Sequence, residues 1–60
     1  MAESVGRISQ VLGAVVDVDF SGAHLPEIYD AVRVPRDGGQ RDLILEVQTQ
    51  LGGSVVRAVA

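Results

Sequence analysis

Two carboxylates stand on alternate positions in the stretch VLGAVVDVDF, residues 11–20. In an extended strand, Asp17 and Asp19 share one face, with their side chains roughly 6–7 Å apart. A pair of acids near this spacing is compatible with glycoside hydrolysis. However, acid–base catalysis also needs burial or charge coupling that separates the two pKa values, and no substrate cleft is evident. We interpret the pair as the solvated face of a strand, and an acid–base enzyme built on it is the competing hypothesis.

The remaining reactive side chains do not form a site. His24 is the only histidine and the chain has no cysteine, whereas a metal site needs several such ligands. We therefore interpret His24 as a solvated loop residue and Tyr29 as a packing residue. No G-x-S-x-G motif surrounds any serine. The serines lie at turns or on strands: Ser4, Ser9, Ser21 and Ser54.

Two glycine pairs, Gly38-Gly39 and Gly52-Gly53, invite comparison with a phosphate-binding loop. That loop requires G-x-x-x-x-G-K-[ST] followed by a helix, and this chain contains no lysine. Each pair is better explained as a hairpin turn, because glycine adopts positive φ at little cost. The sequence thus predicts no catalytic, cofactor-binding or metal-binding residue, and no bound cofactor.

Composition restricts the possible partners. The formal net charge is −3 and aromatic residues are 3% of the chain, which disfavours nucleic-acid binding. No apolar run is long enough for a membrane helix, and the beginning of the chain does not resemble a signal peptide. A free-standing small-barrel module that binds a peptide or single-stranded nucleic acid is a second functional hypothesis.

The elements that must position these residues are strands, because β-branched residues are plentiful and turn signals recur at short intervals. We expect a bulge or kink at Gly13. The segment Leu25–Asp30 is expected to form one helical turn, with Leu25, Ile28 and Tyr29 covering an open end of the sheet. The five expected strands span residues 5–12, 14–20, 31–35, 42–49 and 54–59. This spacing predicts a small all-β domain, a closed or nearly closed antiparallel barrel.

Three blocks of residues resemble the beta subunit of rotary F-type ATP synthases. GRISQVLGAVVDVDF, residues 6–20, matches the pattern G-x-I-x-x-V-x-G-x-V-V-D-V-x-F of that family. LPEIYDAVRV, residues 25–34, is similar to the segment that follows. LILEVQTQLGGSVVRAVA, residues 43–60, resembles L-x-L-E-V-x-x-x-L-G-x-x-x-V-R-x-I-A, with Val59 at a position where Ile is common.

The resemblance implies an N-terminal β-barrel that packs beside the barrels of neighbouring alpha and beta subunits in the crown of a hexamer. ATP or ADP and magnesium would bind in a central domain whose motifs are absent from this chain. The chain alone is therefore expected not to be an enzyme, although its parent synthesises ATP coupled to proton translocation. The parent complex would be peripheral to the cytoplasmic face of the bacterial inner membrane, and this domain would not contact the membrane. An isolated fragment would be cytosolic.

The same resemblance sets the expected domain organisation. Residues 1–5 would be an N-terminal tail, and residues 6–60 would form the barrel, cut before its sixth strand. A missing strand leaves unpaired backbone N–H and C=O groups along an edge. We therefore expect the chain to self-associate through such an edge, or to pair with a supplied strand.

Overall fold

The computed structural model describes residues 4–60, in which every regular element is a strand. The strands are β1 (Arg7–Leu12), β2 (Val15–Asp19), β3 (Ala31–Val34), β4 (Leu43–Gly52) and β5 (Val55–Val59). The all-β class and the five expected strands are confirmed. Their ends differ by a few residues, most clearly in β4, which continues beyond Thr49 to Gly52. Residues 4–60 contain no helix that is long and apolar enough to span a membrane.

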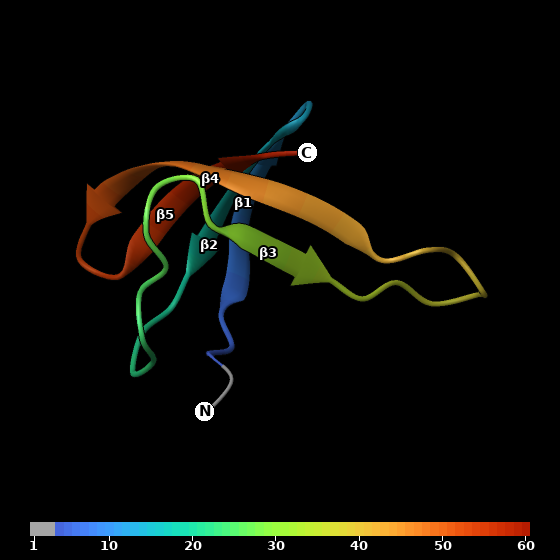
Figure 1. Cartoon of the computed structure of the whole chain (residues 1–60), viewed down its shortest axis with the longest axis horizontal. Helices are drawn as coiled ribbons and strands as arrows, with labels where there is room; N and C mark the ends of the chain where they lie inside the picture. The colour runs from blue at the N-terminus through green and yellow to red at the C-terminus, as the bar shows by residue number, and fades with distance from the viewer. Residues whose placement is uncertain (1–3) are drawn as a thin grey trace.

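The strands form one antiparallel sheet in the order β1-β2-β5-β4-β3. A hairpin, β1–β2, meets a three-stranded meander, β3–β4–β5, and the return of β2 beside β5 makes a Greek key. The sheet curls into an open half-barrel rather than a closed one (Figure 1). The strands β1 and β3 are its two edges, and the long connection between β2 and β3 crosses from one half of the sheet to the other.

Each of two tight hairpin turns has glycine as its first central residue. The β1–β2 hairpin turns at Gly13-Ala14 and the β4–β5 hairpin turns at Gly53-Ser54, with glycine φ values of 61° and 62°. A type II′ hairpin turn requires positive φ at its first central residue. The bulge expected at Gly13 is therefore wrong. The irregularity in β1 lies between Ile8 and Gln10 instead, where one residue has no direct partner on β2.

The core lies on the concave face of the three central strands. Alternate residues of β2, β4 and β5 point inward, which is the period-two pattern of a sheet with one covered face. The buried set comprises Val16, Val18, Phe20, Leu45, Val47, Val56 and Ala58. Four partly buried side chains extend it, namely Leu25, Val32, Val34 and Leu43. No core residue comes from β1, whose six residues are all exposed.

The connection before β3 contains a β-turn and no helical turn. The N–H of Asp30 donates to the carbonyl of Glu27 at 3.0 Å, and Tyr29 has a φ of 74°. Leu25 packs against the core as expected. The same expectation is wrong for Ile28 and Tyr29, which are 47% and 74% exposed. Both side chains are exposed in this turn, and Tyr29 is therefore not a packing residue.

Candidate functional site

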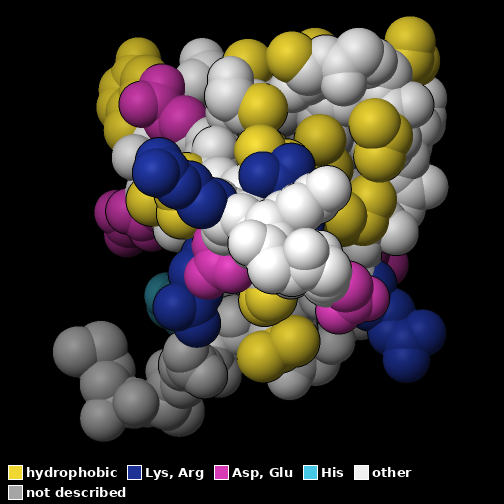
Figure 2. Space-filling model, turned by 90° about the vertical axis from the view of Figure 1, so that its right-hand side faces the viewer, with side chains coloured by type: hydrophobic (Ala, Val, Ile, Leu, Met, Phe, Trp, Pro, Cys, Tyr) yellow, Lys and Arg dark blue, Asp and Glu magenta, His cyan; other side chains and the backbone are white. Residues whose placement is uncertain are grey.

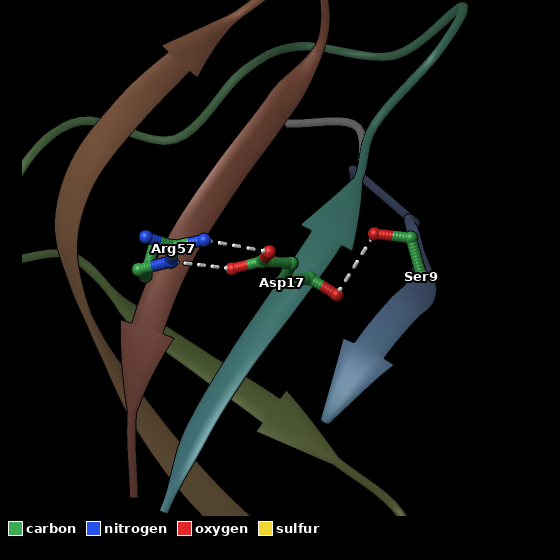
Figure 3. A network of polar contacts seen from close by, with 3 residues as sticks. All are labelled: Ser9, Asp17 and Arg57. Atoms are coloured by element: carbon green, nitrogen blue, oxygen red, sulfur yellow. Dashed lines mark hydrogen bonds and ion pairs between the residues drawn. The ribbon is translucent and has the colours of Figure 1, made fainter. Parts of the chain in front are cut away.

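The most organised polar group in the molecule is the pair of Asp17 and Arg57. These residues face each other across the central strands β2 and β5. The guanidinium of Arg57 donates from Nε to Oδ1 of Asp17 at 2.9 Å and from Nη2 to Oδ2 at 3.1 Å (Figure 3). On the other side of β2, the Ser9 hydroxyl donates to the backbone carbonyl of Asp17 at 3.3 Å. Both carboxylate oxygens of Asp17 therefore have a partner.

The environment of Asp17 differs from the solvated strand face expected from the sequence. Its side chain is only 9% exposed, because it lies between the neighbouring strands and under the half-exposed side chain of Arg57. The prediction of a solvated face is therefore wrong for this residue. An apolar strand tolerates the buried acid because a bidentate arginine supplies charge and hydrogen bonds together.

The pair determines the ionisation of both groups. The hydrogen bonds from Arg57 lower the pKa of Asp17, against the opposing effect of burial, and the positive charge lowers it further. The same contacts raise the pKa of Arg57. Asp17 thus remains a carboxylate at neutral pH with its oxygens occupied. A general acid requires the opposite shift, so this geometry supports a structural ion pair.

Asp19 has a different and local role. Its Oδ1 accepts hydrogen bonds from the backbone N–H of Ser21 at 2.9 Å and from the Ser21 hydroxyl at 2.6 Å. These bonds lower the pKa of Asp19, the hydroxyl contributing most. A carboxylate that binds the backbone two residues later stabilises a turn. Asp17 and Asp19 therefore have separate partners, and the structure does not bring them together as a catalytic pair.

The other residues considered in the sequence are dispersed. His24 is exposed in a loop, as expected, and its carbonyl accepts from the Ser4 hydroxyl. Ser54 lies in the β4–β5 turn, where its carbonyl accepts from the N–H of Phe20 at 2.7 Å. Gly38 and Gly39 lie in a turn, whereas Gly52 ends β4 and Gly53 begins the β4–β5 turn, and all four have positive φ. Within residues 4–60, no three His, Cys, Asp or Glu residues gather as metal ligands do.

The largest hollow follows the opening between the two edge strands. It has a volume of about 1040 Å³ and is lined by residues 4–8, which include the start of β1, and by residues 30–35, which include β3. Val18 and Phe20 of the core lie at its floor, while Arg7 and Arg33 stand at its rim. Figure 2 shows one face of the molecule, on which hydrophobic side chains are exposed between basic and acidic ones. Ser4, His24 and Asp30 also line the hollow.

Arg57, the partner of Asp17, could not be identified from the local sequence pattern alone. A signal was present: VVDVD and VVRAV are two largely apolar strands, and the residues at their third positions, Asp17 and Arg57, have opposite charges. Opposite charges that face each other across a strand pair stabilise a sheet. The pairing of β2 with β5 requires a contact over forty positions of sequence, however, and local patterns do not determine it.

The fold and the polar groups together describe a small β-barrel scaffold whose most buried charge is used for structure. A family model, that of the ATP synthase alpha/beta family β-barrel domain, matches residues 8–60. The chain therefore belongs to the ATP synthase alpha/beta family, and these residues form its β-barrel domain. The resemblance found in the sequence is confirmed at this level. The barrel is a non-catalytic region of these subunits, and membership implies assembly within an alpha/beta hexamer.

Proposed function

We propose that this chain is the structural and assembly domain of an ATP synthase beta subunit. In this role it packs beside neighbouring alpha and beta barrels and forms part of the crown of the hexamer. The observation that carries the proposal is the match of the barrel family over residues 8–60. The ion pair of the buried Asp17 with Arg57 across the strands supports the proposal. Such a pair stiffens a scaffold, and it leaves Asp17 without a catalytic role.

The assignment to the beta subunit rests on two segments of the sequence. VVDVDF, residues 15–20, and LILEVQTQLGG, residues 43–53, are more similar to beta than to alpha subunits. The first contains all of β2 and the second contains all of β4, so the distinguishing residues lie in the central part of the sheet. We extend the proposal to the parent protein: it synthesises ATP coupled to proton translocation, and ATP or ADP and magnesium bind in another domain.

A stiff barrel suits this role for a mechanical reason. The three catalytic sites of the ring pass through different conformational states. The ring therefore needs one part whose own conformation stays the same. The β2–β5 ladder has five paired positions at the centre of the sheet, and the Asp17–Arg57 contact locks their register. We propose that the complex lies at the cytoplasmic face of the bacterial inner membrane and that this barrel does not touch the membrane.

Association with the alpha subunit tests the proposal. Analytical ultracentrifugation of the chain mixed with purified alpha subunit is expected to show a complex, in which the sedimentation coefficient of alpha increases. The same chain mixed with a single-stranded oligonucleotide serves as the competing arm. Binding to the oligonucleotide in low salt, without binding to alpha, would favour the free-standing binding module and overturn the assembly role.

A further inference from the structure

The loop between β3 and β4 holds an aspartate followed by glycine at its tip. Asp37, Gly38 and Gly39 lie in this loop, and all of residues 35–42 are exposed. Figure 1 shows the loop projecting from the end of the sheet. Exposed loop tips with small and polar residues are the parts of a domain where chain cleavage and tolerance to change concentrate.

An aspartate followed by glycine can react with its own backbone. The amide nitrogen of the glycine attacks the carbon of the protonated side-chain carboxyl group, and a succinimide ring forms. A C–N bond is made, a C–O bond is broken, and the carboxyl hydroxyl leaves as water with the amide proton. Water then adds to either carbonyl of the ring. One product is aspartate, and the other is isoaspartate, in which the main chain runs through the side-chain carbonyl.

The surroundings of Gly38 leave its amide nitrogen accessible to this attack. A Cβ built on Gly38 meets no atom within 4 Å, so no other part of the chain crowds the site. Gly38 and Gly39 have φ values of 73° and 77°. Because glycine adopts both signs of φ at little cost, the backbone can rotate until the carboxyl carbon of Asp37 reaches the nitrogen.

The other four aspartates are held by partners or precede a larger residue. Each accepts a hydrogen bond or forms an ion pair: Asp17, Asp19, Asp30 and Asp42. Asp42 lies in the same loop, but it is 3.5 Å from Arg33 and is followed by Leu43. Within residues 4–60, no such contact holds the carboxylate of Asp37, and no other aspartate precedes a glycine.

We propose that Asp37 is a modification site at which isoaspartate forms spontaneously, with the backbone nitrogen of Gly38 as the nucleophile. The product has one more methylene in the main chain at the loop tip. The sheet tolerates it, because Nε of Arg36 donates to the carbonyl of Arg41 at 2.7 Å and joins the two sides of the loop below the tip. The inference goes beyond the proposed function and does not depend on it.

Labelled water tests the reaction at the level of single residues. The chain is kept for weeks at neutral pH and physiological temperature in water that contains heavy oxygen, and is then digested with trypsin in ordinary water. Cleavage after Arg36 and Arg41 releases residues 37–41, whereas Asp42 falls in residues 42–57. Each ring opening incorporates one heavy oxygen, and reversed-phase chromatography separates isoaspartyl from aspartyl peptides. Label and isoaspartate should accumulate in residues 37–41 and not in residues 42–57.

Three variants identify the reacting groups. Asp37→Glu keeps the charge and should abolish the label, because glutamate must close a larger ring. Gly38→Val should slow the reaction at least about tenfold, because a β-branched side chain crowds the nitrogen, whereas the matched Gly39→Val should slow it less than about threefold. Circular dichroism verifies that the sheet is intact in each variant, as expected for substitutions in an exposed loop.

The unfolded chain measures what the fold contributes. In guanidinium chloride the rate at Asp37 should rise less than about threefold, because the loop already lies outside the sheet and needs no unfolding to react. Four results would overturn the inference: no isoaspartate in residues 37–41, equal label in residues 42–57, equal rates in Gly38→Val and Gly39→Val, or a folded chain that reacts at least about tenfold more slowly than the unfolded one.

Discussion

At the scale of single residues, the contact between Asp17 and Arg57 makes stability depend on pH. The pKa of Asp17 is lower in the folded chain than in the unfolded one, where it is about 3.9. Its stabilising contribution is therefore complete above the unfolded pKa and is lost as the pH falls through the folded pKa. The lowered pKa of Asp19 acts in the same direction.

Replacing Asp17 isolates its share of this effect. Asp17→Asn should lower the urea midpoint at neutral pH, because Arg57 loses its charged partner, and should flatten the decline of the midpoint below about pH 4. Urea titrations between about pH 3 and pH 7 measure both changes. Asp37→Asn, in the exposed β3–β4 loop, is the control and should behave like the natural chain. An equally steep acid decline in Asp17→Asn would show that the pair does not cause it.

A second residue, Gly6, is required by close packing rather than by backbone conformation. A Cβ at this position would lie 2.8 Å from the backbone oxygen of Asp19 and 2.8 Å from Cδ1 of Phe20. Gly6→Ala should therefore destabilise the fold by about 1–3 kcal/mol, as measured by denaturant unfolding. The adjacent control, Val5→Ala, changes a side chain that is 74% exposed and should cost less than about 0.5 kcal/mol. Equal effects would contradict the packing argument.

At the scale of secondary-structure elements, two neighbouring residues of β4 lie on opposite faces of the sheet. Leu45 is completely buried, whereas Ile44 is 55% exposed. Leu45→Ala should cost about 2–5 kcal/mol, a large share of the roughly 3–9 kcal/mol available to a domain of this length. Ile44→Ala should cost much less. Thermal unfolding followed by circular dichroism compares the two, and a reversed order would show that the register of β4 is wrong.

The hairpin turns supply a second test of the elements. Gly53 begins the β4–β5 turn with a φ of 62° and has open space around its Cα, so a side chain there meets conformational strain and no clash. Gly53→Ala should destabilise the fold by about 1–2 kcal/mol. Ser54→Ala, at the second position of the same turn, should have a smaller effect. Chemical unfolding of both variants measures the difference, and a neutral Gly53→Ala would argue against a type II′ turn.

At the scale of the whole molecule, the open half-barrel should be unevenly stable. The strands β2, β5 and β4 hold the core, while β1 contributes no buried residue. Amide hydrogen exchange should therefore be slowest in β2 and β5 and faster in β1 and β3. Uniform protection in dilute solution would indicate a closed barrel.

Much of the fold could be predicted because its signals are local. Alternation identified all five strands, and Gly38-Gly39 and Gly52-Gly53 identified two hairpins that the structure contains. The errors occurred where one local signal allows two outcomes. Gly13 permits either a bulge or a turn, and the apolar Ile28 and Tyr29 suggested packing although a β-turn exposes them.

The sequence by itself determined the class of fold, the family and the composition of the turns, because period-two alternation, glycine positions and matched motifs are properties of short segments. Only the tertiary structure decided which strands are neighbours. It placed β5 beside β2, which buried Asp17 and gave it Arg57 as a partner, and it left β1 as an open edge. The physical reason is that burial and ion pairing depend on contacts between distant segments, and a periodic pattern shows which face of a strand is apolar but not what will cover it.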